Sequence, residues 1–294
     1  MLFLGNVTGT NSVAFDINKN TPSLQGKTIL ITGGDSGIGK QAICYLALLS
    51  PSEIWLAAPN TRLRTVQLDL ASFSSIRAAA ATLIAQIERL DLLFLNAGVM
   101  GVSAGLTEDG YEYQFGINHL GHALLTKLLL PVLIRTAEPG RDVRVIATSS
   151  YSHRNAPSGG GVDFNTLKTD AKDLPTLKRY AQSKLANILF ARALAERYPQ
   201  LTALAIHPGA CRTNLVLGVT ESSLLDRIVG LFVYQPVEIV AKHHVWAAVT
   251  QDLESGEYYE PLGISGQGRP EARDKDLALK LWNWTEDELR LHAL

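Results

Sequence analysis

One tyrosine and one lysine are spaced so that their side chains could act together in proton transfer. Of the nine tyrosines in this 294-residue chain, only Tyr180 has a lysine four residues later, Lys184. Both lie in a stretch rich in helix formers, 180–198, and residues four apart share one face of a helix. A phenol beside an ammonium group could donate or accept a proton on a bound substrate. Chance can also produce one such pair, so the rest of the chain has to support it.

Polar residues follow three of the expected strands and lie in a helix between them. They are Asn96-Ala97-Gly98 after the strand Leu92–Leu95, Ser149-Ser150 after a strand at 143–148, His207-Pro208-Gly209 after a strand at 201–206, and Asn118 in the helix. The carboxyl ends of parallel strands meet at one edge of a sheet, where α/β proteins bind their ligands. Taken singly, each of these residues could equally be a cap, a turn residue or loop punctuation.

A glycine-rich turn follows the first expected strand, Thr28–Thr32. It reads Gly33-Gly34-Asp35-Ser36-Gly37-Ile38-Gly39, and a helix is expected at 40–49. Glycines let the backbone approach a pyrophosphate, and the free N–H groups of a helix N-terminus attract its negative charge. Strand, glycine turn and helix in this order indicate a dinucleotide site, although a glycine turn alone is a weak indication.

The same turn contains Gly34-Asp35-Ser36-Gly37, which is similar to the nucleophile segment of trypsin-like serine proteases. Such a hydrolase is an all-β double barrel, whereas this serine sits in the first strand-to-helix turn of an alternating pattern. A serine hydrolase is therefore the third hypothesis. It would show ester or peptide cleavage that is lost on Ser36→Ala.

Short apolar runs alternate with helical stretches along the chain. The runs that predict buried strands are Thr28–Thr32, Glu53–Ala57, Leu92–Leu95, 143–148 and 201–206. The stretches that predict helices are 70–90, 111–133 and 180–198. This alternation predicts a single α/β domain with a doubly wound parallel sheet. Thr285 and Glu288 predict a capping box at the start of a last helix.

Composition excludes several classes of function. The net charge is −1 and the basic residues form no runs, so a nucleic-acid partner is not expected. The apolar start, 1–4, is too short for a signal peptide or a membrane span, and we expect a cytoplasmic protein. Cys44 and Cys211 lie far apart, and His119 and His122 have no third ligand at zinc-site spacing. No metal site is expected.

In this order, the signatures resemble those of the short-chain dehydrogenase/reductase family over most of the chain. In detail the chain is similar to the retinol-dehydrogenase-like branch common among fungal enzymes. The segments that carry this resemblance are Phe15-Asp16 ahead of Gly26-Lys27, Arg179-Tyr180-Ala181-Gln182-Ser183-Lys184-Leu185-Ala186-Asn187, Tyr258-Tyr259-Glu260-Pro261-Leu262-Gly263 and Leu281-Trp282-Asn283-Trp284-Thr285. The resemblance implies a Rossmann-type fold and an enzyme that interconverts a small carbonyl compound and its alcohol by hydride transfer with NAD(P).

The resemblance also implies roles for four catalytic candidates. Tyr180 would give its proton to a substrate carbonyl, or act as the base in the reverse direction. A free phenol has a pKa near ~10, and Lys184 together with the positive nicotinamide ring would lower it. Ser150, the second serine of its pair, would hydrogen-bond the carbonyl oxygen. Asn118 would hold a water molecule that joins Lys184 to a proton relay.

A further set of residues is implied to bind the dinucleotide. Lys184 would bind the nicotinamide ribose, and Thr213 would bind the carboxamide. The full set is Gly33, Ser36, Gly37, Ile38, Gly39, Arg62, Asp69, Asn96, Ala97, Gly98, Tyr180, Lys184, Pro208, Gly209 and Thr213.

The choice between NADP and NAD depends on the segment after the second strand. Sites that prefer NAD place an acid about twenty residues past the glycine turn, and the range 54–68 contains no acid. Arg62 and Arg64 could approach a 2′-phosphate, so we expect NADP, with NAD as the alternative. Against this, Ala58-Pro59-Asn60 stands where the branch usually carries Ala-Arg-Asn.

The connection between the second and third strands is abnormally short. Relatives of this branch carry a helix there, whereas this chain leaves only 58–64 between Glu53–Ala57 and an expected strand at 65–68. A parallel crossover needs a dozen or more residues. The third strand is therefore expected to be missing, antiparallel or displaced, with Asp69 and Leu70 out of place and looser nucleotide binding.

Other segments divide the single domain 1–294. The N-terminal extension is 1–26, the C-terminal helical tail is 270–294, and the apolar segment 220–234 lies where the family has its mobile substrate lid. An apolar lid would suit a hydrophobic substrate. The alternative interpretation of the segment, an amphipathic helix packed on the core, is equally compatible with the sequence. The family often dimerises through helices that here span 111–133 and 180–198, so a homodimer is an expected arrangement.

A dinucleotide-binding protein with little or no turnover is the competing hypothesis. The catalytic positions are all present, which argues against it, whereas the shortened nucleotide side argues for it.

Overall fold

The computed structural model describes residues 12–57, 64–138, 140–211, 234–251 and 253–292. Seven strands form one sheet in the order β3-β2-β1-β4-β5-β6-β7, and every neighbouring pair is parallel. The strands are β1 (Thr28–Thr32), β2 (Glu53–Ala57), β3 (Thr65–Val66), β4 (Leu92–Leu95), β5 (Arg144–Thr148), β6 (Thr202–Ile206) and β7 (Tyr258–Tyr259). The predicted α/β fold with a doubly wound parallel sheet is confirmed.

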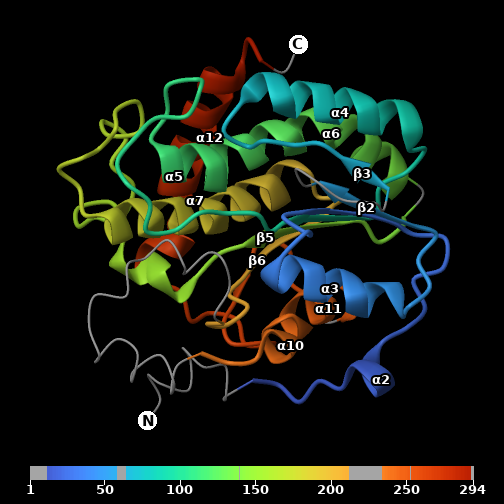
Figure 1. Ribbon diagram of the computed structural model, residues 1–294. Helices are drawn as coiled ribbons and strands as arrows, with labels where there is room; N and C mark the ends of the chain where they lie inside the picture. Colours follow the sequence, from blue (N-terminus) through green and yellow to red (C-terminus); the bar gives the residue numbers. More distant parts are fainter. Residues whose placement is uncertain (1–11, 58–63, 139, 212–233, 252, 293–294) are drawn as a thin grey trace.

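Helices cover both faces of this sheet, as Figure 1 shows. One face carries α4 (Phe73–Gln86), α6 (Gly121–Ala137) and α7 (Thr176–Arg197), with α12 (Lys275–Leu289) packed on α7. The other face carries α3 (Gly37–Ala47), α10 (Val237–Val240) and α11 (Lys242–Val249). Further short elements among the described residues are α2 (Ile17–Asn20), α5 (Tyr113–Phe115), the π-helix η1 (Gly116–Leu120), and the 3-10 helices η2 (Tyr151–Asn155) and η3 (Pro270–Arg273).

The alternation of side chains along each strand builds two apolar cores. In β1, Leu30 joins the core under α4, α6 and α7, whereas its neighbours Ile29 and Ile31 join the core under α3 and α11. All three side chains are fully buried. A strand that is buried on both faces reads as a continuous apolar run, which is why the sequence predicts the strands so well.

The last helix begins earlier than predicted. Asp274 caps α12, because its side chain accepts a hydrogen bond of 2.9 Å from the backbone N–H of Leu277. The predicted capping box of Thr285 and Glu288 is therefore wrong. Both residues lie inside the helix, where the Thr285 hydroxyl contacts His119 Nε2 at 3.2 Å and Glu288 accepts a hydrogen bond from the Tyr111 hydroxyl. Their spacing serves docking against the domain and not helix initiation.

The third strand also differs from the prediction. β3 is present and pairs with β2 in parallel, with Thr65 opposite Leu56 and Val66 opposite Ala57. The expectation of a missing, antiparallel or displaced strand is therefore wrong. β3 has only two residues, and they pair with the last two residues of β2. After β2 ends, the chain therefore has to go back along the strand direction by only about one residue's rise, and a full crossover is unnecessary. The connection itself falls largely on residues 58–63, which lie outside the described residues.

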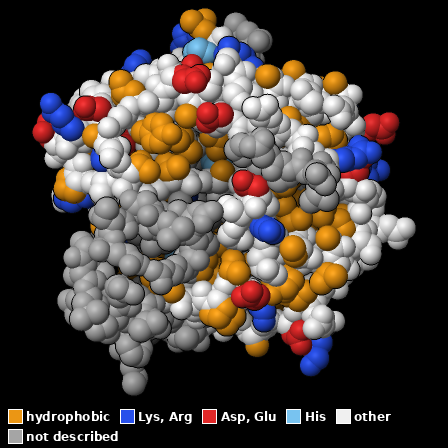
Figure 2. Space-filling view, viewed as in Figure 1, with side chains coloured by type: hydrophobic (Ala, Val, Ile, Leu, Met, Phe, Trp, Pro, Cys, Tyr) orange, Lys and Arg blue, Asp and Glu red, His pale blue; other side chains and the backbone are white. Residues whose placement is uncertain are grey.

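The surface shows no segregation of charge on the face seen in Figure 2, where Lys and Arg side chains lie interspersed with Asp and Glu. Apolar side chains gather where Figure 1 draws α3 and α10, and Leu48 and Ile239 are exposed large apolar residues on or beside these helices. In the described part of the chain, the stretch Tyr113–Ala137 is long and apolar enough to cross a membrane, but 78% of its most apolar window is buried in the domain. It forms part of the core layer.

Candidate active site

The residues that follow β4, β5 and β6 surround a cavity of about 290 Å³. The described residues that line it are Ile38, Asn96, Gly98, Met100, Thr148, Ser149, Ser150, Tyr151, Ser152, Tyr180, Lys184, His207, Pro208, Gly209, Ala210, Cys211 and Tyr234. This edge of the sheet is the one that the parallel topology predicts for a ligand. The cavity brings the predicted serine, tyrosine and lysine together with part of the predicted dinucleotide site.

Tyr180 and Lys184 reach this cavity from α7. They lie one turn apart on the same helix face, and each is only 3% exposed. Lys184 Nζ lies 5.6 Å from the centre of the Tyr180 ring. The same nitrogen donates a hydrogen bond of 3.0 Å to the carbonyl oxygen of Thr148, at the end of β5. The helix therefore supplies both groups, and the strand end fixes the lysine.

Burial moves the pKa values of the two groups in opposite directions. It raises the pKa of Tyr180 to about 12, and a hydrogen bond with Ser150 lowers it by a smaller amount. It lowers the pKa of Lys184 to about 8. Removal from water disfavours the charged form of either group. In the protein without cofactor, desolvation therefore outweighs the lowering by Ser150, and the expected joint effect of Lys184 and the nicotinamide on the phenol pKa stays a prediction.

The two serines after β5 have different partners. The Ser149 hydroxyl donates a hydrogen bond of 2.7 Å to the backbone carbonyl of Lys184, which ties the strand end to α7. Ser150 caps η2 by accepting a hydrogen bond of 3.1 Å from the N–H of Ser152. Its own hydroxyl hydrogen remains available for Tyr180 or for a substrate oxygen. Of the pair, Ser150 has the geometry that the sequence analysis expects.

Asn118 lies in the π-helix η1, beside the cavity and not in its lining. Its side chain exchanges two hydrogen bonds with the backbone of Val99, of 2.8 and 2.9 Å, and donates a third of 3.0 Å to Ser183 Oγ. A Cβ atom on Gly98 would lie 3.0 Å from Asn118 Oδ1 and 3.4 Å from Lys184 Nζ. The amide is thus close to the lysine, but its own bonding capacity is used by the protein.

The glycine turn after β1 can be built only with glycine at two positions. Gly33 has a φ of 64°, and a Cβ atom there would lie 2.9 Å from the Cα atom of Ala97. Gly39 is in α3, and a Cβ atom there would collide with the carbonyl oxygen of Gly33. Ser36 is the N-cap of α3 and makes no side-chain capping bond. The result is a bare backbone cradle before a helix N-terminus, which fits a pyrophosphate.

A second cavity of about 400 Å³ lies on the other side of Gly98. Its lining residues are Thr32, Gly33, Ala57, Gln67, Leu68, Asp69, Leu70, Ala97, Gly98, Val99, Tyr113 and Ile117. Asp69 and Leu70 therefore lie beside Gly33 and Ala97, in contrast to the expected displacement. The Asp69 carboxylate accepts a hydrogen bond of 2.8 Å from the N–H of Ala71. Gly98 lines both cavities, so the two are neighbours at the edge of the sheet where a dinucleotide is expected.

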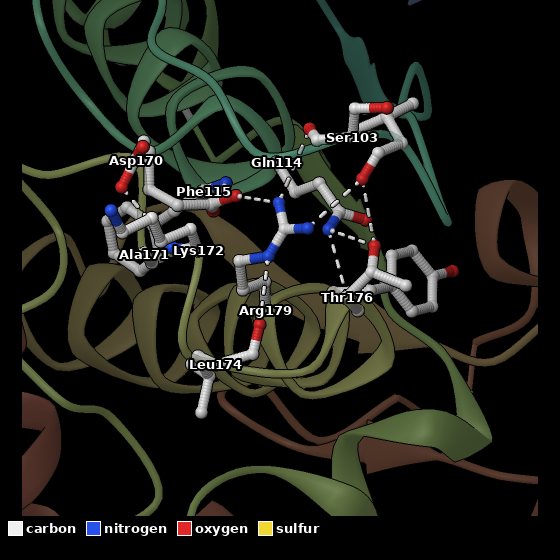
Figure 3. A network of polar contacts seen from close by, with 12 residues as sticks. Ser103, Gln114, Phe115, Asp170, Ala171, Lys172, Leu174, Thr176 and Arg179 are labelled. Atoms are coloured by element: carbon white, nitrogen blue, oxygen red, sulfur yellow. Dashed lines mark hydrogen bonds and ion pairs between the residues drawn. The ribbon is translucent and has the colours of Figure 1, made fainter.

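Arg179 anchors the start of α7, as Figure 3 shows, and it precedes Tyr180 in the sequence. Its guanidinium group donates to the carbonyl oxygens of Leu174 and Val102 and to Glu112 Oε1, at 3.1 to 3.2 Å. Glu112 is fully buried and Arg179 is 4% exposed. The pair ties α7 to the loop after β4. Sequence reasoning missed it, because nothing in a sequence pairs an acid with a base 67 residues away.

Several predicted residues are not brought to the site or lie outside the described residues. Arg62, Thr213 and most of the lid segment, 220–233, fall outside. Arg64 is described, and it forms an ion pair of 2.9 Å with Glu53 and lies over the Trp55 ring. The described contacts of its side chain are therefore with side chains of β2, and it lines neither cavity. Among the described residues, no three His, Cys, Asp or Glu side chains gather as metal ligands would.

Comparison with known proteins identifies the family. The family model described as short chain dehydrogenase matches residues 27–162. Human retinol dehydrogenase 13 is 39% identical over 286 residues, which cover 88% of this chain and 83% of that protein. The chain belongs to the short-chain dehydrogenase/reductase family. A short-chain dehydrogenase/reductase of Aspergillus calidoustus is 33% identical and covers 93% of this chain and 96% of its own length. The resemblance to the retinol-dehydrogenase-like branch is confirmed.

Solved structures agree with this fold. A crystal structure of an uncharacterised protein from Mycobacterium paratuberculosis superposes with a TM-score of 0.73, at 29% identity over 95% of this chain and 98% of that one. The NADPH-bound carbonyl reductase from chicken fatty liver has a TM-score of 0.60 at 21% identity, over 80% of this chain and 96% of that one. At that identity the second match shows the fold alone.

Proposed function

We propose that this short-chain dehydrogenase/reductase interconverts a carbonyl group and an alcohol on a small, hydrophobic substrate, with Tyr180 as the general acid and base. The observation that carries the proposal is the convergence of Ser150, Tyr180 and Lys184 on one cavity beside the glycine turn. A bound nicotinamide dinucleotide supplies or accepts the hydride. The chain itself must orient the substrate, move the proton and exclude water.

The proton chemistry follows from the partners of each side chain. Ser150 donates its hydroxyl hydrogen to the substrate carbonyl oxygen, because that oxygen can only accept, while the Ser150 oxygen itself accepts from the N–H of Ser152. Tyr180 donates its proton to the same oxygen in reduction, and takes it back in oxidation. With a pKa of about 12 in the protein alone, the phenol is a reluctant donor near neutral pH. A positive charge brought close by the bound cofactor would lower that pKa toward the working range.

The substrate class is argued from the wall of the cavity. Apart from Lys184 and the titratable His207, no Lys, Arg, Asp or Glu is among the described residues that line it, and Met100, Tyr151, Cys211 and Tyr234 contribute apolar surface. A buried site without a second charge disfavours an ionised substrate. The relatives named retinol dehydrogenase support an apolar aldehyde or alcohol.

For the cofactor we propose NADP(H), with NAD(H) as the alternative. The glycine cradle, Asn96, Ala97 and Gly98 fit the pyrophosphate and adenosine sides of either dinucleotide. Solved neighbours hold NADPH in chicken carbonyl reductase and NADH in a 3-ketoacyl reductase from Brucella melitensis, so the fold accommodates both. With Arg64 paired to Glu53, the argument for NADP(H) rests on Arg62 and on the lack of an acid in 54–68.

We propose that the enzyme is cytoplasmic. For a homodimer, we expect an interface that avoids the face formed by α6 and α7. That face is covered by the chain's own α12. Trp282 stacks on Phe190 of α7 at 5.7 Å between ring centres, and Glu286 forms an ion pair of 2.7 Å with Lys127 of α6.

The competing proposal is a dinucleotide-binding protein with little or no turnover, favoured by the short connection at 58–64. Reduced cofactor that carries deuterium on its transferable position separates the two. With a panel of aromatic and aliphatic aldehydes and ketones, the proposed enzyme places deuterium on the product's carbinol carbon. Cofactor binding without deuterium transfer to any carbonyl would favour the competing proposal.

A further inference from the structure

A closed ring of hydrogen bonds surrounds Gly98, the residue shared by the two cavities, and a buried histidine completes it. We propose that His122 is a positioning residue that fixes the segment Asn96–Val99 between the catalytic cavity and the nucleotide cavity. His122 lies in α6, is 2% exposed and touches neither cavity itself. Its effect on cofactor binding rests on the proposed function, whereas its effect on this segment does not.

One half of the ring runs through Thr32, at the end of β1. The Thr32 hydroxyl oxygen accepts hydrogen bonds from the backbone N–H groups of Asn96 and Ala97, at 2.9 and 3.0 Å. The same oxygen lies 2.9 Å from His122 Nε2. The hydroxyl thus joins the start of the segment to the histidine.

The other half of the ring runs through Asn118. His122 Nδ1 lies 3.0 Å from the backbone carbonyl oxygen of Asn118. The Asn118 side chain then exchanges two hydrogen bonds with the backbone of Val99, at the other end of the segment. Both ends of the four-residue segment are therefore bonded to groups that meet at His122.

The chemistry of the partners fixes the protonation of the imidazole. A carbonyl oxygen can only accept, so Nδ1 must carry the hydrogen that it donates to Asn118. Burial, opposed in part by the hydrogen bond to the Asn118 carbonyl and assisted by the nearby charge of Lys184, lowers the pKa of His122 to about 4. The ring is therefore neutral, and its Nε2 can only accept. The Thr32 hydroxyl hydrogen has two acceptors in reach, His122 Nε2 at 2.9 Å and the Phe94 carbonyl oxygen at 3.3 Å, and the shorter contact favours the histidine. A neutral imidazole, with one donor nitrogen and one acceptor nitrogen, therefore matches its two partners, the Asn118 carbonyl oxygen and the Thr32 hydroxyl group.

Every residue of the segment lines a cavity: Asn96 and Gly98 line the catalytic cavity, and Ala97, Gly98 and Val99 line the nucleotide cavity. Gly98 lines the catalytic cavity on one side and the nucleotide cavity on the other. Its Cα position leaves little space before Asn118 Oδ1 and Lys184 Nζ. The Asn96 side chain is held by other groups: its Nδ2 donates to the carbonyl oxygens of Thr32 and Gly33 at 2.9 and 3.3 Å, and its Oδ1 lies 3.1 Å from His244 Nε2. Loss of His122 should therefore loosen the segment without releasing it completely.

His119 provides a matched control on the same stretch of helix. It is equally buried, at 1% exposed, but its Nε2 contacts Thr285 of α12 at 3.2 Å and its ring packs on Phe115 and Phe190. Replacement of either histidine with leucine removes a buried imidazole from the same layer of the protein. Only replacement of His122 breaks the ring around Gly98.

The first experiment follows amide hydrogen exchange of a peptide that covers Asn96–Val99, in the protein without cofactor. We expect exchange in His122→Leu to be about 10-fold faster or more, because about one hydrogen bond's worth of stability is lost. His119→Leu should leave that peptide unchanged. Thr32→Val, which keeps the side-chain shape and removes the hydroxyl, should reproduce the effect of His122→Leu. It serves as the second variant if His122→Leu does not fold.

The second experiment measures the dissociation constant for NADPH and the kcat of the same variants. His122→Leu should weaken binding by about 10-fold, and His122→Gln, which keeps a donor and an acceptor, should recover part of it. The double variant Thr32→Val/His122→Leu should be little worse than either single variant, since both break one ring. Unchanged exchange at Asn96–Val99 in His122→Leu, or equal exchange in His119→Leu, overturns the inference. A wild-type protein that binds no dinucleotide contradicts the proposed function instead, while the exchange result still decides the role of His122.

Discussion

Lys184 Nζ donates a hydrogen bond of 3.0 Å to the carbonyl oxygen of Thr148, so that α7 and β5 are joined at the point where the catalytic groups meet. Asn187, one turn further along α7, donates to the same oxygen at 3.1 Å. The lysine is thereby held in a buried position where its charge is disfavoured. The buried charge of Lys184 should therefore lower the stability of the fold while it serves the proposed reaction, and both effects can be measured.

Lys184→Met should stabilise the protein near neutral pH while abolishing turnover. The folded pKa of about 8 lies below the unfolded value of 10.5, so between these pH values the unfolded state binds more protons. Wild-type stability therefore rises with pH across that window, and the full penalty of burial is present below pH ~8. We expect the variant to be more stable by roughly 1–3 kcal/mol at pH ~7. The advantage should shrink as the pH rises from ~8 to ~10.

Urea unfolding of both proteins at several pH values in this range measures the difference. A variant that is less stable than the wild type at neutral pH, or an advantage that grows with pH, would contradict the buried charge.

Ser149→Ala and Ser150→Ala should separate a structural serine from a catalytic one. Ser149 bonds the helix backbone, so its loss should lower stability by about 1 kcal/mol and leave kcat within a few-fold. Ser150 bonds Tyr180, so its loss should lower kcat by about 10²-fold with little change in stability. Steady-state rates and thermal melts of the two variants test this. The reverse pattern would assign the substrate contact to Ser149.

Glu112→Gln should destabilise the protein although it lies outside the catalytic cavity. The change leaves the buried Arg179 without its carboxylate, and such a loss typically costs about 3 kcal/mol or more. The double variant Glu112→Gln/Arg179→Met removes the unpaired charge and should be closer to the wild type. Chemical denaturation of the three variants tests the pair. A double variant that is no more stable than Glu112→Gln would mean that the unpaired charge is not the cause.

Most of the fold could be predicted because buried parallel strands read as continuous apolar runs. β1, β2 and β4 have the predicted bounds, and β5 and β6 each begin one residue later. The third strand was predicted wrongly because the rule for crossover length assumes strands of full length, whereas β3 pairs through two residues. The position of α12 was missed because Thr285 and Glu288 match a capping pattern while contacting His119 and Tyr111 instead.

The candidate site was predictable where a residue's type and its place after a strand carry the information. Ser150, Tyr180 and Lys184 meet as expected. The residues that hold them, such as Arg179, Glu112 and His122, were not predicted as partners. Each reaches its partner across a long stretch of sequence, and a buried histidine or ion pair leaves no local pattern.

Arg62→Ala should weaken binding of NADPH more than binding of NADH. An arginine that contacts the 2′-phosphate contributes a charged hydrogen bond that NADH cannot form, so a loss of about 10-fold is expected for NADPH alone. Arg64→Ala is the matched control, because Arg64 pairs with Glu53 and should affect neither cofactor. Fluorescence titrations of both variants with both cofactors give the answer. Equal affinity of the wild type for NADH and NADPH would contradict the proposed preference.

The most direct test of the account is a comparison of cofactor binding and turnover in Tyr180→Phe. The change removes one hydroxyl group from a buried ring and leaves the glycine cradle and Lys184 in place. We predict that NADPH binds within about 3-fold of the wild-type affinity, while carbonyl reduction falls by at least ~10²-fold, the usual contribution of a general acid. Turnover that persists near the wild-type rate in Tyr180→Phe would contradict the central claim that this phenol transfers the proton.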